Sequence, residues 1–463
     1  MNNNFYQSIS SLLRGYEDGS ITPSSVLDRC LSRISSLEDR LGAFEVVYEE
    51  EARKAADAVT RAFESGHRIG PFHGIPFALK DIVDLEGRIT TGGSKVLKDR
   101  VSPTTATIAK RLIAAGGILV GKTKTVEVAM GGWGTNQHMG TPWNPWDLKN
   151  HRTPGGSSSG SAVAVASGMV SCAVGTDTGG SVRGPAAWCG ITGLKTTEGQ
   201  IPTDGIMPLS HTLDTAGPMA RSVADTALMY EVMLGRHPVD IDQDRSEGYG
   251  FYSLMSQGVA GLRLGVLNDI EREFVASDIL ELYDVACGTL KQLGAELVTF
   301  SGPKSFDDMK ESTGVIIYSE GYFHHGEMYE QEDAPVDTDV RPRILTGRSF
   351  SARDYVAALQ QRQRDQQEFL RSMVGLSALL TPTMTTPPVP LPEVDQGSTP
   401  GYFTRGGNYL GLCGLSVPMG LTAEGLPGGL QILGRGNEEG MTLRIGAAFE
   451  QQSGPFPHPS IDG

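Results

Sequence analysis

The chain has 463 residues, of which 39% are hydrophobic and 20% charged, proportions that suit a globular protein with a large buried core. The formal net charge is −15 at pH 7, from 39 basic and 54 acidic side chains. Such a balance repels phosphate backbones and anionic lipids, so it argues against a nucleic-acid-binding or membrane-surface protein.

Cysteine spacing gives no sign of a disulfide framework. The five cysteines are far apart, and no two have zinc-ligand or redox-motif spacing: Cys30, Cys172, Cys189, Cys287 and Cys413. We therefore expect reduced, mostly buried thiols and a cytoplasmic protein. The first twenty residues lack the basic and apolar regions of a signal peptide, and the weakly polar stretch 161–175 is too short to cross a bilayer.

The first part of the chain, about residues 5–66, is predicted to be helical. Between residues 22 and 41 apolar side chains recur at helical spacing, with Thr22 and Ser24 as candidate caps. A second helix is expected in EEEARKAADAVTRAFESG, which is acidic at its start and stops at Gly66.

Strands and helices alternate after this region. IPFALKDIVD predicts a buried strand that contains Lys80, and TATIAKRLIAAGG and ILVGKT predict a helix and a second strand. The pattern returns in LRLGVL, a helix at about residues 277–293, and AELVTF. Another helix is expected in SVADTALMYEVML, with Ser222 as N-cap. These units predict a parallel sheet covered by helices in one domain. The Pro-rich stretch from Thr381 is interpreted as a surface loop, because patterned sequence resumes at Asn408.

Two Gly/Ser-rich segments carry the candidate chemistry. PGGSSSGSAVAVASG, residues 154–168, has the composition of a flexible linker, but it passes directly into small apolar residues that favour tight packing. GTDTGGSVRGPAAWCG, residues 175–190, contains Gly179, Gly180 and Ser181. Consecutive small residues let backbone N–H groups point into one concavity, which is typical of an oxyanion site, and Ser181 stands where a nucleophile is needed.

A nucleophilic serine needs a base, and no histidine occurs in a motif-like context; His211 and the pair His324–His325 are interpreted as surface or loop residues. Lys80 is the other candidate, since it lies within an apolar run. Burial lowers the pKa of a lysine toward neutrality, which creates a base. The competing interpretation is a lysine at a strand end whose amine reaches solvent.

Taken together, these segments resemble the amidase signature family. The resemblance rests on GGSSSGSAVAVASG, on GTDTGGSVRGPAAWCGITGLK and on Lys80 in ALKDIVD, with Ser157 and Ser181 24 positions apart as in that family. MGGWGTNQHMGTPWNPWD, MPLSHTLDTAGPMARSVAD and NYLGLCGLSVPMG are similar to other blocks of the family, so the likeness covers most of the chain.

The resemblance implies a fold. We expect one α/β amidase domain over residues 1–463, with a mixed, mostly parallel twisted sheet covered by helices on both faces. Within it, N-terminal helices occupy about residues 5–66 and a signature core about residues 70–235. The remainder completes the same sheet and pocket.

The resemblance also implies a site. Ser181 is expected to be the nucleophile, Ser157 on a cis peptide the proton relay, and Lys80 the base. Backbone N–H groups of Thr178, Gly179, Gly180 and Ser181 are expected to form the oxyanion hole. Met130, Gly131 and Trp133 are expected to bind substrate, and no metal or organic cofactor is expected. Asp177 and Arg183 are interpreted as scaffolding of the loop in preference to substrate binding.

The chain departs from the family pattern after GLK. Family members often have Pro-Thr-Tyr-Gly-Arg there, whereas this chain has Thr-Thr-Glu-Gly-Gln at residues 196–200, and Ser159 replaces a usual glycine. We therefore expect this loop to be shaped for a different substrate, which favours a stand-alone enzyme.

The function predicted from the resemblance is an amidohydrolase, a monomer or homodimer, that cleaves a small-molecule amide or carbamate. Aryl amides, anilides and urethanes are the substrates considered. One alternative is the glutaminase subunit of a tRNA-dependent amidotransferase, with Arg341, Arg343 or Arg348 holding the carboxylate of glutamine. An alternative of another class is a catalytically silent binding protein on an amidase scaffold.

Overall fold

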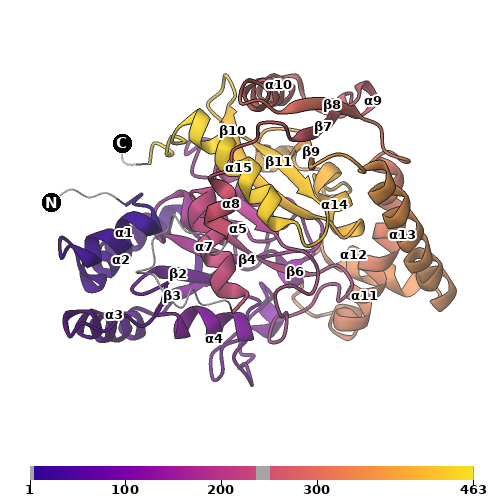
Figure 1. The fold of residues 1–463 in the computed structure, drawn as a ribbon. Coiled ribbons are helices and arrows are strands. Elements are labelled where there is room, and N and C mark those ends of the chain that lie inside the picture. Colours follow the sequence, from indigo (N-terminus) through magenta and orange to yellow (C-terminus); the bar gives the residue numbers. More distant parts are fainter. Residues whose placement is uncertain (1–4, 236–250, 462–463) are drawn as a thin grey trace.

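A long mixed sheet organises the computed structural model, which describes residues 5–235 and 251–461 (Figure 1). The described residues form 11 strands in the order β1-β3-β2-β4-β6-β5-β10-β11-β9-β7-β8. The strands are β1 (Phe44–Val47), β2 (Pro76–Lys80), β3 (Ile118–Thr123), β4 (Cys172–Asp177), β5 (Thr192–Lys195), β6 (Thr215–Ala220), β7 (Arg263–Leu267), β8 (Glu296–Phe300), β9 (Ala378–Pro382), β10 (Cys413–Leu421) and β11 (Pro427–Gly434).

Parallel pairs lie toward the two ends of the sheet, and antiparallel pairs fill its centre. β2 is parallel to β3 and β4, and β7 is parallel to β8 and β9. From β4 through β6, β5, β10 and β11 to β9, each neighbouring pair is antiparallel. The two predicted strand–helix–strand units are confirmed as parallel pairs. The strand β1, which the sequence pattern does not predict, adds an antiparallel edge beside β3.

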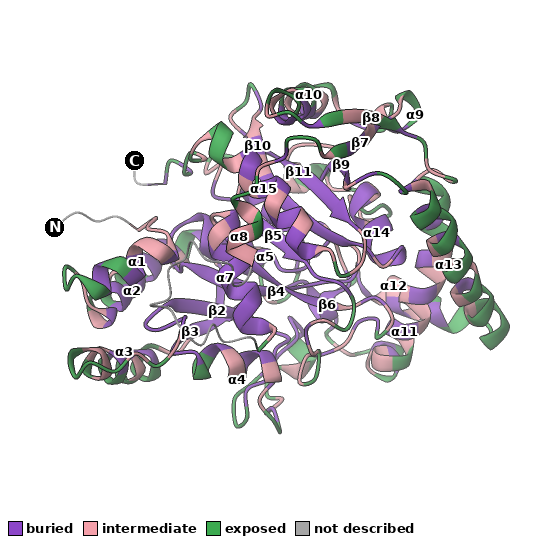
Figure 2. Ribbon diagram, in the orientation of Figure 1, coloured by how far each residue is buried: buried purple, intermediate pink, exposed green. Residues whose placement is uncertain are grey.

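Helices cover both faces of the sheet, as predicted. Along β2 the side chains of Phe77 and Leu79 belong to one hydrophobic cluster, which also contains residues of α7, α10 and α15. Ala78 points the other way, into a cluster with residues of α5 and α6. Because both faces are covered, every residue of β2, β4, β6 and β11 is buried, and these strands form the purple centre of Figure 2.

The predicted N-terminal helices are confirmed within residues 5–66. Thr22 caps the longest of them by accepting a hydrogen bond from Ser25 N at 3.2 Å. The pair Ile9 and Asp225 ties this region to the core, because the Ile9 N–H donates to Asp225 Oδ1 at 3.0 Å. The helices here are α1 (Ile9–Glu17), α2 (Pro23–Leu41) and α3 (Glu49–Glu64).

The other predicted helices are found close to their expected positions, and Ser222 caps α7 by accepting from Asp225 N at 3.1 Å. The Pro-rich stretch from Thr381 begins inside β9, since Thr381 and Pro382 belong to that buried strand, and Thr383 and Met384 are also buried. Its interpretation as a surface loop is therefore wrong for residues 381–384, while the residues that follow form no long helix or strand. The remaining α-helices are α4 (Thr107–Ala114), α5 (Ser159–Ala166), α6 (Arg183–Cys189), α7 (Val223–Met233), α8 (Phe251–Met255), α9 (Asp269–Arg272), α10 (Ser277–Gln292), α11 (Lys310–Glu330), α12 (Arg341–Thr346), α13 (Ala352–Ser372), α14 (Tyr402–Tyr409) and α15 (Glu439–Ser453).

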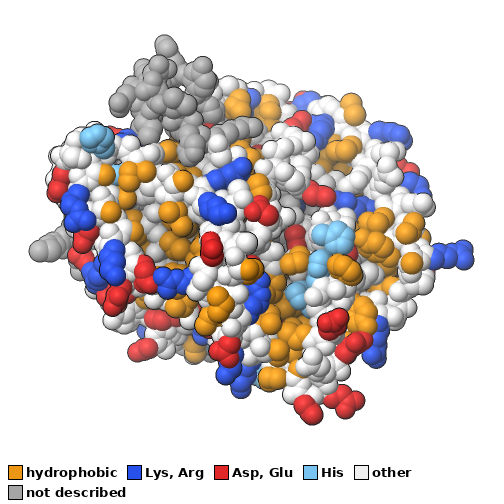
Figure 3. Space-filling view, turned by 90° about the horizontal axis from the view of Figure 1, so that it is seen from below, with side chains coloured by type: hydrophobic (Ala, Val, Ile, Leu, Met, Phe, Trp, Pro, Cys, Tyr) orange, Lys and Arg blue, Asp and Glu red, His pale blue; other side chains and the backbone are white. Residues whose placement is uncertain are grey.

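The charged side chains of both signs that the composition contains are mixed on the surface seen in Figure 3. On the face drawn in Figure 3, basic and acidic side chains are interspersed and no single-sign stripe is visible. Within residues 5–235 and 251–461, none of the helices combines the length and the hydropathy that crossing a bilayer requires.

Candidate active site

Lys80 is the last residue of β2 and is completely buried. Its Nζ donates hydrogen bonds to Ser157 Oγ at 2.7 Å and to Thr176 Oγ1 at 2.8 Å. The amine is therefore hydrogen-bonded to two hydroxyl groups inside the protein. The interpretation of Lys80 as a strand-end lysine that reaches solvent is wrong.

Burial lowers the pKa of Lys80 to about 7, although the nearby charges of Asp214 and Asp177 favour its ammonium form. A lysine with such a pKa is neutral in a substantial fraction of molecules near pH 7. In that form it can accept a proton through the hydroxyl it contacts.

Ser157 lies in the Gly-rich loop before α5, and the peptide bond between Gly156 and Ser157 is cis. A Cβ at Gly156 would lie 2.6 Å from Gly134 N, so only glycine fits there. The Ser157 carbonyl oxygen accepts a hydrogen bond from Thr125 Oγ1 at 2.9 Å. Residues 154–168 are thus all buried, with a loop that leads into α5, and the interpretation of them as a flexible linker is wrong.

Ser181 lies on the turn between β4 and α6. The preceding Gly180 has a φ of 129°, and a Cβ there would collide with Thr404 Oγ1, so this position also requires glycine. The Ser181 carbonyl oxygen accepts from Ser158 N at 3.3 Å. This bond joins the turn that carries Ser181 to the loop that carries Ser157.

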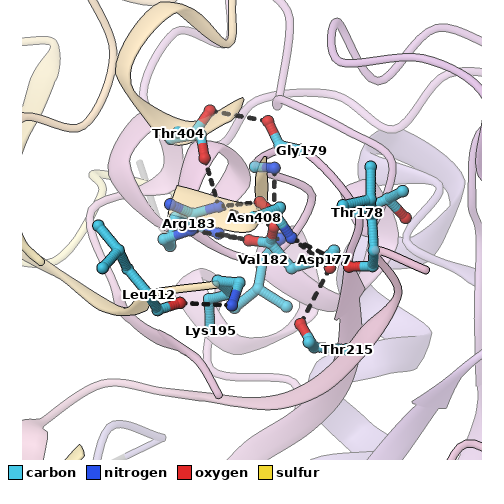
Figure 4. Close-up of polar contacts among 12 residues, drawn as sticks. Asp177, Thr178, Gly179, Val182, Arg183, Lys195, Thr215, Thr404, Asn408 and Leu412 are labelled. Atoms are coloured by element: carbon cyan, nitrogen blue, oxygen red, sulfur yellow. Dashed lines mark hydrogen bonds and ion pairs between the residues drawn. The ribbon is translucent and has the colours of Figure 1, made fainter. Parts of the chain in front are cut away.

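A buried ion pair holds the turn in place (Figure 4). Arg183 donates to both carboxylate oxygens of Asp177, at 3.0 and 2.9 Å, and to Thr404 O and Asn408 Oδ1. Asp177 Oδ1 also accepts from Gly180 N at 2.7 Å. Burial opposes ionisation, but the Arg183 charge lowers the pKa of Asp177 to about 2. Both side chains are fully buried, which supports their interpretation as scaffolding.

The four backbone N–H groups expected to form the oxyanion hole differ in their bonding. Gly180 N–H is already engaged by Asp177. Within the described part of the chain, the N–H groups of Thr178, Gly179 and Ser181 form no hydrogen bond. These three groups are free to donate to a bound oxygen.

Ser181 lies on the wall of a cavity of about 660 Å³. Lys80 and Ser157 are not on this wall, so a ligand in the cavity meets Ser181 first. The wall includes the two glycines before Ser181, Gly156, and residues of α11, α12 and α14. Of the predicted substrate-binding residues, Met130 and Gly131 line the cavity. Trp133 lies behind the wall, where it stacks on Trp188 and donates to Ser398 O at 3.2 Å.

The three arginines considered as carboxylate ligands occupy different places. Arg343 lines the cavity, but it donates to Met130 O at 3.2 Å and to Gln396 Oε1 at 2.9 Å. Arg341 donates to main-chain carbonyl groups such as Tyr329 O, and Arg348 is exposed. Neither Arg341 nor Arg348 lines the cavity.

The loop that departs from the family pattern is also away from the cavity. Thr197 N donates to Glu439 Oε1 at 2.7 Å, and Thr197 Oγ1 accepts from Asn437 N. None of residues 196–200 lines the cavity wall. The expectation that this loop shapes the substrate site is therefore wrong, and it packs against α15 and the residues before it.

Sequence reasoning missed two polar residues beside Lys80. Thr176 accepts from Lys80 Nζ, and Asp214 accepts from Thr178 Oγ1 at 2.5 Å. Burial raises the pKa of Asp214 to about 6. Both residues line a small cavity of about 80 Å³ together with His211. Each occurs in a segment that carried the family resemblance, which is the signal that could have found them.

Among the described residues, neither a histidine nor a group of metal ligands belongs to the larger cavity. Among the residues that the structure describes, no histidine is part of its wall. His211 and His324 contact each other, with 3.3 Å between Nδ1 and Nε2, and His324 lies in α11 and not in a loop. Over residues 5–235 and 251–461, no three His, Cys, Asp or Glu side chains are grouped to hold a metal ion.

Comparisons with known proteins show which family and which fold this chain shares. The family model described as Amidase matches residues 25–443. The chain is 34% identical to the A subunit of glutamyl-tRNA(Gln) amidotransferase from Anaeromyxobacter dehalogenans (strain 2CP-C), over 95% of this chain and 94% of that protein. Its structure resembles native peptide amidase from Stenotrophomonas maltophilia, with a TM-score of 0.86, 28% identity and 99% of each chain covered. It also resembles a bacterial aryl acylamidase of the amidase signature family, with a TM-score of 0.85, 26% identity and 97% of each chain covered.

Proposed function

Because the chain belongs to the amidase family, whose members act on C–N bonds, we propose that it hydrolyses a carboxylic amide or carbamate through an acyl-enzyme on Ser181. The observation that carries this proposal is the 2.7 Å contact between the buried amine of Lys80 and Ser157 Oγ, next to the turn that carries Ser181. A buried lysine with a lowered pKa and a serine on a cavity wall are the two parts that such chemistry needs.

The reaction begins with proton transfer in the proposed mechanism. Neutral Lys80 accepts a proton from Ser157, which takes one from Ser181 as Ser181 Oγ attacks the carbonyl carbon. The negative charge on the carbonyl oxygen is stabilised by the N–H groups of Thr178, Gly179 and Ser181, each worth about 3–4 kcal/mol.

Collapse of the tetrahedral intermediate breaks the C–N bond, and the proton held by Lys80 returns through Ser157 to the leaving nitrogen. Water then attacks the acyl-enzyme. It gives one proton back to Ser181 by the same relay and releases the carboxylic acid, or, from a carbamate cleaved at its C–N bond, an alkyl hydrogen carbonate that decomposes to the alcohol and CO2.

The size of the cavity supports a substrate larger than a simple primary amide. Its 660 Å³ falls inside the range of about 300–1,000 Å³ that accommodates drug-sized molecules. Apolar side chains on its wall, including Leu209, Val315 and Ile317, suit an aromatic or aliphatic group. Aryl amides, anilides and urethanes are the substrates that we propose for a stand-alone enzyme.

The similarity to an amidotransferase component favours a second candidate, in which this chain is the glutaminase component of a complex. The 34% identity to that relative exceeds the identity to the two hydrolases. In this role the chain would hydrolyse glutamine and require a partner chain.

A substrate panel tests these candidates. Purified protein is assayed with p-nitroanilides, primary amides, carbamates and glutamine, the last with and without amidotransferase partner subunits. Turnover of anilides or carbamates by the chain alone supports the stand-alone enzyme, and turnover of glutamine alone supports the amidotransferase component. A Ser181 that resists labelling by a phosphonofluoridate, with no turnover of any substrate, would favour the silent binding protein.

A further inference from the structure

Arg405, on α14, contributes a cationic side chain to the wall of the large cavity. Its stem runs beside the turn that carries Ser181, because a Cβ at Gly179 would lie 3.8 Å from Arg405 Cγ. At the other end, Arg405 Nη2 donates to Thr399 Oγ1 at 3.3 Å, and Thr399 also lines the cavity. The guanidinium group therefore lies along the cavity wall within the same chamber as Ser181.

The Arg405 guanidinium lacks an anionic partner. Within the part of the chain that the structure describes, no carboxylate oxygen lies within 4.0 Å of it, and the bond to Thr399 is its one hydrogen bond. Asp307 and Tyr318 influence it only at longer range. Burial lowers the pKa of Arg405, which reflects its partial removal from water. A partly desolvated cation without a counterion is unfavourable, and a bound anion removes that cost.

The other arginines near the site are already paired with the protein. Arg183 donates to Asp177, Gln431, Asn408 and Thr404 O, and Arg343 forms three hydrogen bonds, one to Met130 O and two to Gln396. Arg405, with a single hydrogen bond, has the most donors left for a ligand among these three arginines. A guanidinium group offers a planar fork of N–H donors that matches the two oxygens of a carboxylate.

We propose that Arg405 binds a carboxylate group of the substrate, so that the amide or carbamate cleaved at Ser181 carries a negative charge. The inference rests on the proposed function and narrows its substrate class to anionic amides. The carboxylate can belong either to the acyl part or to the amine part of the substrate, and the experiment has one arm for each.

Matched substrate pairs test the proposal. The first pair is the mono-4-nitroanilide of succinic acid and the 4-nitroanilide of butyric acid, in which a methyl group replaces the carboxylate on the acyl part. The second pair is 4-butyramidobenzoate and 4-butyramidotoluene, which differ in the same way on the amine part. We expect the wild type to favour the charged member of at least one pair in kcat/KM by about 10- to 100-fold, the effect of a hydrogen bond to a charged group.

Two variants locate the effect. R405Q is expected to remove at least nine-tenths of that preference, mainly through KM, and R405K to retain part of it. The control is R348Q, which removes the same charge from an exposed residue outside the cavity wall and is expected to leave the preference as in the wild type.

Binding provides a readout that does not depend on turnover. In S181A, calorimetric binding of the charged member should be at least tenfold tighter than in S181A/R405Q, with melting temperatures compared to show that both are folded.

Equal preference in wild type and R405Q, or equal binding in the two S181A proteins, would overturn the proposal. Neutral substrates that turn over without any charge preference would also contradict it while leaving the proposed hydrolase intact. Absence of turnover with every substrate would count against the hydrolase, and the binding comparison would still decide the role of Arg405.

Discussion

Asp177 and Arg183 clamp the two ends of the turn that carries Ser181, with Nε–Oδ2 and Nη2–Oδ1 distances of 3.0 and 2.9 Å. Both side chains have no solvent exposure, so each charge depends on the other for its stability. The clamp fixes the turn from within the core, while Thr404 and Asn408 of α14 hold it from the side.

Removal of one partner should destabilise the protein strongly. For R183M we expect the free energy of unfolding to fall by about 3–5 kcal/mol, because the Asp177 carboxylate is left buried without its counterion. Urea denaturation followed by circular dichroism measures the change. R348M, at an exposed position, serves as the control and should fall within about 0.5 kcal/mol of the wild type. A similar loss in both variants would contradict the role assigned to the clamp.

Alanine substitution of the three proposed catalytic residues should lower turnover by different amounts. S181A is expected to abolish turnover, while K80A and S157A lower kcat on the order of 10⁴-fold, because attack without a relay and base is slow. Steady-state kinetics on the best substrate from the panel measures these effects. Near-normal rates in K80A would show that the base is assigned to the wrong residue.

The pH dependence of the rate should follow the ionisation of the Lys80 amine. With its pKa lowered to about 7, the amine is protonated and inactive below that pH, so kcat/KM should fall about tenfold per pH unit there and level off above. Asp214 and Asp177 are the carboxylates that favour the ammonium form, and the contacts Ser157 and Thr176 are neutral. D214N is therefore expected to lower the pKa of Lys80 and move the acidic limb to lower pH.

A pH–rate profile of D214N against the wild type checks this direction. D99N is the control, since Asp99 is highly exposed and its removal should leave the limb in place. A limb that moves to higher pH in D214N would mean that the carboxylate does not stabilise the ammonium group.

Gly180 should tolerate no side chain. In G180A the new methyl group would collide with Thr404 Oγ1 and lie 2.8 Å from Thr404 Cβ, at a φ of 129° that side chains rarely adopt. We expect loss of at least nine-tenths of turnover, with a lower melting temperature. G288A is the matched control, because no atom lies within 4 Å of a Cβ there, and alanine in the middle of α10 should stabilise the protein by about 0.5–1 kcal/mol. Wild-type turnover in G180A would show that the turn is less constrained than its packing implies.

Local pattern is enough to predict much of the fold and the candidate residues. Apolar runs identify β2 and β3, and helical spacing identifies α2 and α10, because these elements are long or strongly patterned. Ser181 and Lys80 can be named because a serine after two glycines and a lysine in an apolar strand are each unusual in their local context.

Contacts between distant parts of the chain cannot be predicted in this way. Arg405 and Thr404 reach the site from α14, more than 200 positions after Ser181, and nothing in their local sequence indicates that contact. Because Trp133 is close to Met130 in the sequence, it is predicted to line the pocket. In the structure it stacks instead on Trp188, a residue 55 positions away that the local sequence does not bring to mind as a neighbour. The prediction for the loop at residues 196–200 fails for the same reason, since proximity along the chain to Ser181 does not give proximity to the cavity.

The late position in the chain of the central strands β5, β6, β10 and β11 has a consequence for any attempt to shorten this protein. Lys80, Ser157 and Ser181 all precede position 190, so a fragment ending there would contain every group that we propose to react. Such a fragment would nevertheless lack β5, β6, β10 and β11, which fill the middle of the sheet, and α14, which braces the turn that carries Ser181. Catalytic capacity therefore belongs to the whole folded chain, and a split version should regain it only when both halves are supplied together.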